Sequence, residues 1–285
     1  MVTLYQEVRT ALREANFKPR KRLGQNFLIH ERIVEAILKL IDLSQEDEIV
    51  EIGPGLGFLT RRLLEIAPKV WAIEVDPFLV GYLRKSSIGN HPALDLVHGD
   101  ILKVPLNKIL PDHKVKLVAN LPYSISTPVL FRLFELRDHF SYLVLMVQRE
   151  VAQRMTGSPG TKEYGTLSIW SQIHGEILDQ VSVSSEAFFP RPKVNSTVLK
   201  IALRPEPLVS LKDFAMLRDV VRSAFGKRRK TLSNALGGLL NKKRSEIESC
   251  LRREQIDPRR RGETLNVDEF IRLARSLKTG IGADS

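Results

Sequence analysis

The sequence predicts an α/β fold with a largely parallel sheet, followed by a small domain made only of helices. Two observations carry this prediction. Short apolar runs alternate with segments of helical spacing from residue 29 to residue 148, a rhythm typical of strands joined by right-handed helical crossovers. After the RPEP stretch at residues 204–207, helical spacing alone continues.

The first domain is expected to begin with a helix in residues 29–43, where apolar residues recur on one face. An apolar run then reaches a glycine turn in residues 47–57. Residues 174–189 and 195–203 alternate between apolar and polar side chains, as antiparallel edge strands do. Further helices are expected at residues 58–67 and 78–87, and further strands at residues 69–76, 93–100, 116–120 and 141–148.

The RPEP stretch is the predicted linker, because its two prolines deny both helix and central strand to this part of the chain. We therefore expect residues 1–204 to form the first domain and residues 205–285 to form the second. The second domain contains four short amphipathic segments, each an expected helix, at residues 211–225, 230–240, 244–253 and 266–277.

Positive charge is in excess along the chain. Among its 285 residues, 44 Lys and Arg stand against 33 Asp and Glu, so the formal net charge is +11. Such an excess favours a polyanionic partner, and nucleic acid is the first candidate, although some basic proteins have no such partner. A hydrophobic share of 43% is typical of a soluble globular chain able to bury a core.

The numbers and spacing of cysteine and histidine residues argue against disulfide-linked and metal-binding classes of protein. The single cysteine, Cys250, excludes an internal disulfide and a cysteine-based zinc cluster, and it favours a reducing compartment. The six histidines lack ligand spacing, so we predict no metal site. We find no signal peptide and no apolar run of the ~20 residues that a membrane span needs. We therefore expect a cytoplasmic protein without a membrane partner.

The glycine turn EIGPGLG places Gly53, Gly55 and Gly57 between a strand and a helix. Glycines there allow a ligand to approach the backbone and the free amides of the helix N-terminus. A tight turn without a ligand gives the same pattern, and the spacing G-x-G-x-G departs from the dinucleotide fingerprint G-x-G-x-x-G. The turn alone is therefore a weak indication of a site.

Acidic residues follow the next two strands. Glu74 ends the second strand, where a carboxylate can accept from ribose hydroxyls, and Asp100 ends the third, where it can accept from an adenine amine. As isolated residues both would more often be helix N-caps or surface acids, and Asp76 before Pro77 is the competing N-cap. Because ligands of open α/β sheets lie beyond the carboxyl ends of the strands, we expect these acids and the glycine turn on one rim.

The stretch NLPY, residues 120–123, leaves the fourth strand at the same rim. It is compatible with an ordinary turn, since Asn and Pro both punctuate elements. It is also compatible with a site that grips a flat, hydrogen-bonding ring. The neighbouring strand ends favour the site.

Several motifs occur together and in a set order. They are GQNFL at residues 24–28, EIGPGLG at 51–57, AIEVD at 72–76, HGDI at 98–101, NLPYSISTP at 120–128 and FFPRPKVNS at 188–196, followed by FGKRRKTLSNAL and RRRGETL. With these motifs the sequence resembles the KsgA-type ribosomal RNA adenine dimethyltransferases over residues 18–274. Glycine turns occur in many families, but NLPY together with FxPxPKV and GQNFL is a specific combination.

The resemblance implies a class I, Rossmann-like methyltransferase domain that binds S-adenosylmethionine, with a small all-helical C-terminal domain. It also implies that the QNFL segment closes over the cofactor; from the residues alone, NFL serves equally as a hydrophobic staple for the next helix. The resemblance assigns the glycine turn to the methionine side, Glu74 to the ribose and Asp100 to the adenine. The implied cofactor residues are Asn26, Leu28, Gly53, Gly55, Glu74, Asp100, Ile101 and Asn120.

The implied reaction is methyl transfer to the exocyclic amine of adenine, whose nitrogen lone pair is delocalised into the ring. Two acceptors that hold the amine hydrogens would help, and the Asn120 side-chain carbonyl and the Leu121 backbone carbonyl are the candidates. Pro122 lacks a backbone donor and stiffens the turn, while Tyr123 offers a ring on which the adenine stacks. Phe188 covers the other side of the base by resemblance, or else is a core aromatic.

Basic clusters favour a track for RNA phosphates, although each cluster alone is usually a solvated face. Phosphate contacts would position the RNA while the pocket selects the base. The predicted RNA-backbone contacts are Arg20, Lys21, Arg22, Lys227, Arg228, Arg229 and Lys230.

The activity that the resemblance implies is dimethylation, at the N6 amine, of two adjacent adenosines near the 3′ end of small-subunit ribosomal RNA. The expected partner is a maturing small-subunit particle, and the expected enzyme is a monomer. Two alternatives stay open. One is a methyltransferase of large-subunit RNA of the antibiotic-resistance type, whose members tend to carry NIPY instead of NLPY. The other is a ribosome-assembly binding factor with secondary catalysis.

Overall fold

The structure, a computed structural model, describes residues 3–227, 229–239 and 243–279. The chain divides into two compact units. One division falls after Pro205, next to the predicted boundary, whereas residues 153–175, which the prediction assigns to the first domain, group with the second unit. The first unit contains Met1–Ala152 and Glu176–Pro205, and the second contains Gln153–Gly175 and Glu206–Ser285.

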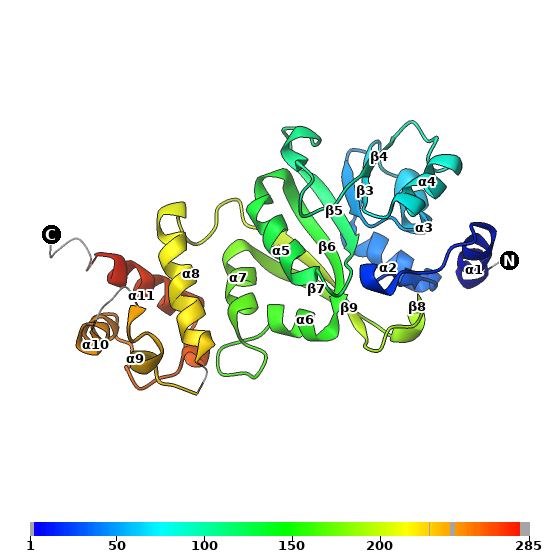
Figure 1. Cartoon of the computed structure of the whole chain (residues 1–285). Coiled ribbons are helices and arrows are strands. Elements are labelled where there is room, and N and C mark those ends of the chain that lie inside the picture. Colours follow the sequence, from blue (N-terminus) through cyan, green and yellow to red (C-terminus); the bar gives the residue numbers. More distant parts are fainter. Residues whose placement is uncertain (1–2, 228, 240–242, 280–285) are drawn as a thin grey trace. The chain divides into compact units, whose positions relative to one another are not determined.

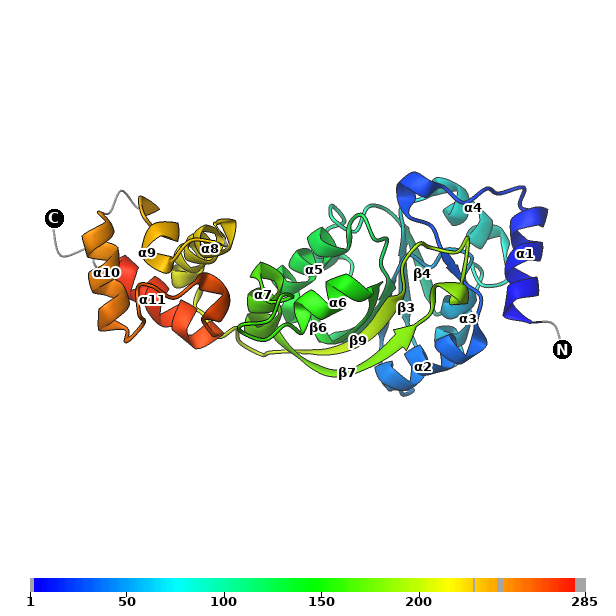
Figure 2. The ribbon, with the colours of Figure 1, turned by 90° about the horizontal axis from the view of Figure 1, so that it is seen from below.

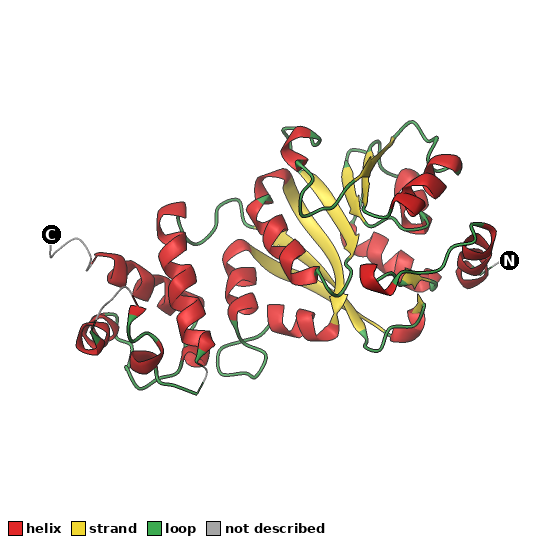
Figure 3. Ribbon diagram, viewed as in Figure 1, coloured by secondary structure: helices red, strands yellow, loops and turns green. Residues whose placement is uncertain are grey.

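The first unit is built on a seven-stranded sheet of strand order β4-β3-β2-β5-β6-β9-β7 (Figures 1 and 3). Strands β2 to β6 pair in parallel, and β9 pairs antiparallel with β6. These positions agree with the predicted alternation and confirm the α/β fold. The bounds are Ile49–Ile52 (β2), Val70–Glu74 (β3), Leu94–His98 (β4), Val115–Asn120 (β5), Phe140–Gln148 (β6), Gly175–Val183 (β7) and Ser196–Leu203 (β9).

The strand order changes direction between β2 and β5. From β2 the chain continues to β3 and β4 on one side of the sheet, and β5 and β6 lie on the other side. In open α/β sheets, ligands bind beyond the carboxyl ends of the strands at such a point. The carboxyl end of β2 leads into the glycine turn and β5 ends at Asn120. The topology therefore brings together two features that lie far apart in the sequence.

Helices cover both faces of this sheet (Figure 2). Ile37 on α2 (Glu31–Ile41) and Leu63 on α3 (Phe58–Leu64) share a buried core with the strand residue Val118. Helix α5 (Ser126–Glu135) lies on the opposite face. Further helices of this part of the chain are α4 (Pro77–Lys85), α6 (Arg149–Met155) and the short 3-10 helices η2 (Leu106–Lys108), η3 (Arg137–His139) and η4 (Ser185–Ala187).

A separate two-stranded sheet ties the segment before α2 to the FFP motif. Strand β1 (Phe27–Leu28) pairs antiparallel with β8 (Phe188–Phe189). The N-terminal helix α1 (Leu4–Glu14) packs nearby, because its apolar face shares a buried core with Phe17 and Phe27. The segment that precedes α2 is thus held by a strand pair and by a helix.

The prediction of two edge strands is wrong for residues 195–203. Strand β7 lies at the edge of the sheet, but β9 lies between β6 and β7, with Val198 and Leu199 fully buried. Ser196 and Thr197 are buried as well. Small hydroxyl side chains can be buried when they find hydrogen-bond partners. The polar positions of β9 therefore do not mark a face in solvent.

The second unit is helical. Leu217 and Val220 on α8 and Phe270 on α11 are fully buried in its core. The predicted segments agree with α8 to α11, but the α-helix within the described residues 230–239 is four residues long, and residue 240 lies outside the described residues. Among the described helices, none is long and apolar enough to span a membrane. Among the described residues of this unit, the helices include α7 (Thr166–His174), α8 (Leu211–Gly226), α9 (Leu232–Ala235), α10 (Arg244–Arg253), η6 (Gly262–Thr264) and α11 (Val267–Thr279).

Candidate active site

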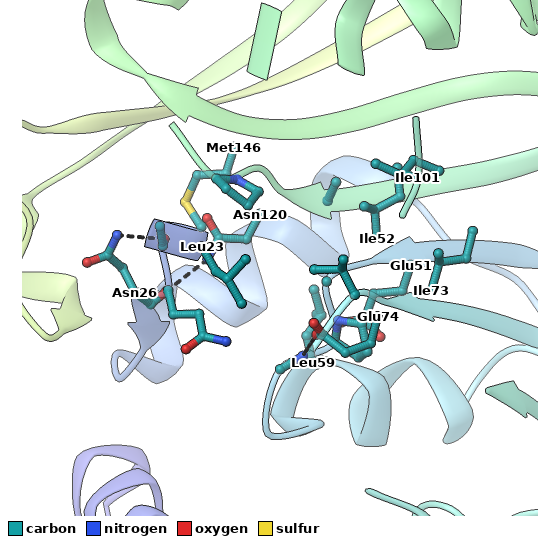
Figure 4. A pocket seen from close by; sticks show the side chains of 18 of the residues that line it. Leu23, Asn26, Glu51, Ile52, Leu59, Ile73, Glu74, Ile101, Asn120 and Met146 are labelled. Atoms are coloured by element: carbon teal, nitrogen blue, oxygen red, sulfur yellow. Dashed lines mark hydrogen bonds between the residues drawn. The ribbon is translucent and has the colours of Figure 1, made fainter. Parts of the chain in front are cut away.

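A cavity of about 280 Å³ opens at the carboxyl edge of the sheet in the first unit (Figure 4). Its volume is close to the lower end of the ~300–1,000 Å³ typical of small-ligand pockets. The strand ends of β2, β3 and β5 line it, together with residues 22–28. All the predicted cofactor residues line this one cavity, namely Asn26, Leu28, Gly53, Gly55, Glu74, Asp100, Ile101 and Asn120.

The glycine turn is required both by backbone conformation and by space. Gly53, Gly55 and Gly57 have φ values of +73°, +60° and +85°, in the left-handed region that favours glycine. A Cβ atom on Gly55 would lie 3.1 Å from Cε1 of Phe27, and one on Gly57 would lie 2.7 Å from Cδ2 of Leu83. The positive φ values disfavour side chains at all three positions, and the backbone of Gly53 and Gly55 forms part of the cavity wall.

Glu74 is held in a fixed orientation at the end of β3. It is only 5% exposed, and its carboxylate accepts hydrogen bonds from the backbone amides of Gly55 (3.2 Å) and Asp76 (2.9 Å). Burial raises the pKa of Glu74, although these two hydrogen bonds oppose the rise. Asp76, not Glu74, caps helix α4 by accepting from the amide of Phe78. Glu74 is therefore neither a surface acid nor an N-cap.

Glu51 also lines the cavity, although it is not among the residues predicted from the sequence. It is 2% exposed on β2, and the hydroxyl of Thr60 donates to its carboxylate at 2.6 Å. Burial raises the pKa of Glu51 to about 7, with a smaller contribution from the neighbouring Glu74 and against the hydrogen bond from Thr60. A lone acid inside an apolar strand, directly before a glycine turn, was the available signal.

Asp100 and Ile101 form another part of the wall. The side chain of Asp100 accepts from the backbone amide of Leu102 at 3.0 Å, which fixes one carboxylate oxygen in a local turn. Ile101 is 4% exposed and lies on the cavity. The pair presents an apolar surface beside a carboxylate.

Asn120 lies where β5 ends, close to the segment that precedes α2 (Figure 4). Its amide nitrogen donates to the backbone carbonyl of Asn26 at 3.2 Å, and the Asn26 amide donates in turn to the carbonyl of Gly24 at 3.0 Å. The nitrogen of the Asn120 amide is thereby engaged. Its oxygen is left as the acceptor of this side chain on the cavity.

The rest of NLPY is only partly on the cavity. Pro122 lines it, whereas Leu121 is 1% exposed and its amide donates to the carbonyl of Met146. The Tyr123 hydroxyl shares a 2.7 Å hydrogen bond with Ser196, and burial raises the pKa of Tyr123. Among the described residues, Leu121 and Tyr123 do not line the cavity. Their roles in catalysis and stacking stay predictions.

Phe188 is a core aromatic in this structure. Its side chain is 2% exposed and shares a buried cluster with Ile37 and Val198. Ile37 and Val198 line the cavity as well, whereas Phe188 itself is not part of the lining. The ring is therefore a buried core aromatic in this structure, and its contact with a substrate base stays a prediction.

The predicted RNA-contacting residues lie in both units. Lys21 and Arg22 are exposed on η1 (Lys21–Leu23), whereas the guanidinium of Arg20 pairs with the buried Asp76 at 3.1 Å. In the second unit Lys227, Arg229 and Lys230 are exposed, and Arg228 lies outside the described residues. Their contacts with RNA stay predictions. Over the described part of the chain, no group of three or more His, Cys, Asp or Glu side chains is arranged to hold a metal ion.

The fold is that of a Rossmann-like methyltransferase, as the strand order, the glycine turn and the acid-lined cavity indicate. Two solved methyltransferase structures have a similar fold. A dimethyladenosine transferase from Plasmodium falciparum matches with a TM-score of 0.77 and 26% identity, over 89% of this chain and 98% of its own. The 23S rRNA methyltransferase ErmE matches with a TM-score of 0.67 and 25% identity, over 89% of this chain and 100% of its own.

The family follows from the sequence comparisons. The family model described as "Ribosomal RNA adenine dimethylase" matches residues 16–279. Ribosomal RNA small subunit methyltransferase A of Geobacter sulfurreducens is 43% identical over 276 residues, 95% of this chain and 100% of that protein. The protein of the same name from Clostridium botulinum (strain Langeland) is 42% identical over 259 residues, 90% of this chain and 94% of that protein. The chain belongs to the ribosomal RNA adenine dimethylase family.

Proposed function

We propose that this protein is an S-adenosylmethionine-dependent enzyme that dimethylates the N6 amines of two adjacent adenosines near the 3′ end of small-subunit ribosomal RNA. One observation carries the proposal: the Asn120 amide, oriented by the carbonyl of Asn26, lines the same cavity as Glu74 and the glycine turn. An acceptor for an amine and an acceptor for ribose hydroxyls therefore share one site. The cited relatives carry the name small subunit methyltransferase A.

The cavity fits S-adenosylmethionine by the chemistry of its lining. Glu74 would accept from the ribose hydroxyls, since its carboxylate is buried and fixed by two backbone amides. The backbone of the glycine turn would lie against the methionine part, and Asp100 with Ile101 would hold the adenine. When bound, S-adenosylmethionine supplies a methyl group on a positively charged sulfur, which leaves as a neutral thioether.

The residues of NLPY would prepare the substrate amine. Its nitrogen is a poor nucleophile while its lone pair is shared with the ring. The side-chain oxygen of Asn120 and the backbone carbonyl of Leu121 would accept its two hydrogens and favour a pyramidal nitrogen. One of these protons becomes acidic after methylation and passes to water, so no strong base is needed. Catalysis would then rest on orientation and electrostatic preorganisation, with Tyr123 as the stacking ring.

RNA binding would rest on the exposed basic residues of both units. A net charge of +11 and the exposed Lys21, Arg22, Lys227, Arg229 and Lys230 support a phosphate track. We infer that the substrate is a maturing small-subunit particle, that the enzyme acts as a monomer, and that it works in the cytoplasm. The ErmE likeness raises large-subunit RNA as a second substrate class, but its identity is 25%, against 42–43% for the small-subunit relatives.

Labelled cofactor distinguishes these substrates. We would incubate the protein with purified immature small subunits and, separately, with large-subunit RNA. Label in small-subunit RNA that is recovered as dimethyladenosine is the expected result. Label confined to large-subunit RNA would contradict the proposal. Strong particle binding without any label would instead favour an assembly factor.

A further inference from the structure

Asp76 connects the segment over the cavity to the wall beneath it. We call residues 20–28 the strap, since residues 22–28 line the cavity from one side. The Asp76 side chain is completely buried. One of its oxygens accepts from the guanidinium of Arg20 at 3.1 Å, and the other accepts from the amide nitrogen of Gln25 at 2.8 Å. Both donors belong to the strap.

The bonds continue from Asp76 into the cavity. The backbone amide of Asp76 donates to one oxygen of Glu74, and the other oxygen accepts from the amide of Gly55. An uninterrupted series of hydrogen bonds therefore runs from the strap to the carboxylate proposed to hold the ribose. Within the strap, the Gln25 side chain also accepts from the amide of Arg20 at 2.7 Å.

The other end of the strap is bonded to the opposite side of the cavity. The carbonyl of Asn26 accepts from the side chain of Asn120, which leaves β5. Gly24 lies against Pro122, because a Cβ atom on Gly24 would be 3.1 Å from Cβ of Pro122. The strap thus bridges the end of β3 and the end of β5. A ligand in the cavity would therefore have the strap along one side.

We propose that Asp76, Arg20 and Gln25 form a latch that holds the strap closed and sets the rate at which the cofactor enters and leaves. Asp76 is a positioning residue in this scheme, because it acts through Glu74 and through the strap. Two features make the latch strong: hydrogen bonds to an ionised group are the stronger kind, and a buried carboxylate that loses its partners is costly to leave exposed to apolar surroundings. The inference rests on the proposed cofactor site.

A simpler role for Asp76 is that of a helix cap, since it also accepts from the amide of Phe78 at 3.0 Å. Arg20 and Gln25 separate the two roles, because replacing them leaves the cap intact. Arg20→Ala and Gln25→Ala are therefore the test variants. Arg61→Ala is the matched control, because Arg61 makes an ion pair of the same length, 3.1 Å, with Glu7, and neither residue belongs to the strap.

The experiment measures the release of labelled S-adenosylmethionine from the full-length protein by rapid dilution, without RNA. Each latch variant should release the cofactor about tenfold faster, the lower end for losing a hydrogen bond to a charged group. In methylation assays the KM for the cofactor should rise in both latch variants. Arg61→Ala should match the wild type. Unchanged release from Arg20→Ala and Gln25→Ala would overturn the latch.

The salt dependence of cofactor release tests the latch separately. A purely structural role of Arg20 would leave this dependence unchanged. Release from the wild type should accelerate with ionic strength, because the half-exposed Arg20 guanidinium pairs with Asp76, and Arg20→Ala should lose this dependence. Equal salt dependence in both proteins would contradict the latch. If the wild type itself does not bind S-adenosylmethionine, the proposed function fails; if it binds and the variants release normally, the latch alone fails.

Discussion

Polar side chains are buried on the cavity rim of the first unit and exposed on the basic surface of the second unit, by which we mean Lys227, Arg229 and Lys230. On the rim, Glu51, Glu74 and Asp76 are 5% exposed or less, and each accepts a hydrogen bond from a fixed neighbour. On the second unit, Lys227, Arg229 and Lys230 are exposed, and so is the ion pair between Arg259, whose side chain is 88% exposed, and Asp257 at 3.0 Å.

This difference in burial suggests that the rim residues determine the reaction and the cofactor binding, whereas the exposed basic residues determine the affinity for RNA. A buried polar group is held in one geometry, and its removal leaves partners unsatisfied, which costs roughly 1–3 kcal/mol or more. An exposed ion pair contributes about 0–1 kcal/mol and is screened by salt. Changes on the rim should therefore act on one step each and strongly. Changes on the basic surface should act weakly, additively and through ionic strength.

The largest effect is expected from Asn120→Ala on the rim. Loss of a preorganised acceptor should lower kcat about 10²–10³-fold in single-turnover methylation, by analogy with loss of one oriented group in other active sites. RNA binding in a filter assay should change little. The control is Asn107→Ala, at an exposed position on η2. Retention of kcat within about threefold would remove Asn120 from the reaction.

Glu51→Gln should change how stability depends on pH. Folding raises the pKa of Glu51 from 4.5 to about 7, so the folded state binds the proton more tightly than the unfolded state. This contribution to stability is complete below pH 4.5 and is lost as pH rises through about 7, by up to about 3 kcal/mol. Urea unfolding between pH 5 and pH 8 should show this loss in the wild type but not in the variant. Parallel profiles for the two proteins would place the titration elsewhere.

Glu74→Gln should weaken cofactor binding. Removing the charge but not the size of this fixed acceptor should raise the Kd for S-adenosylmethionine about 10–100-fold in calorimetry, the loss expected for hydrogen bonds to a charged group. RNA affinity should be unaffected. Glu46→Gln, on an exposed turn, serves as the control. Equal Kd values for wild type and Glu74→Gln would show that the cofactor does not use this carboxylate.

The smallest effect is expected on the basic surface. Replacing Arg229 and Lys230 with Ala should weaken RNA binding a few-fold and should lower the salt slope of binding by about one for each residue that contacts a phosphate. Methylation of saturating RNA should proceed at the wild-type rate. A salt slope identical to that of the wild type would show that Arg229 and Lys230 do not contact RNA phosphates.

The sequence predicted the site residues that lie at the ends of strands. The glycine turn, Glu74, Asp100 and Asn120 were predicted to share one rim because parallel strands end at one edge, and all of them line the cavity. Local spacing carries that information. The placement of β9 inside the sheet was mispredicted, because it depends on pairing with β6 across about 50 residues of chain and on the position of β7 along its other side.

Long-range contacts also explain what was missed or left open at the site. Nothing local marks Arg20 and Gln25 as partners of Asp76, which lies more than 50 residues away. Phe188 was left with two alternatives, because whether its ring enters the core depends on the pairing of β8 with β1. Glu51 was visible as a lone acid in an apolar strand, but its burial and its contact with Thr60 are tertiary facts.

Mass spectrometry of nucleosides is the most direct test of the proposed activity. Small-subunit RNA from immature particles would be incubated with the protein and S-adenosylmethionine, digested to nucleosides and compared with a reaction of the Asn120→Ala variant. We predict that N6,N6-dimethyladenosine accumulates with the wild type and is strongly reduced with the variant. Methylation of another nucleoside, or equal dimethyladenosine from both proteins, would contradict the account.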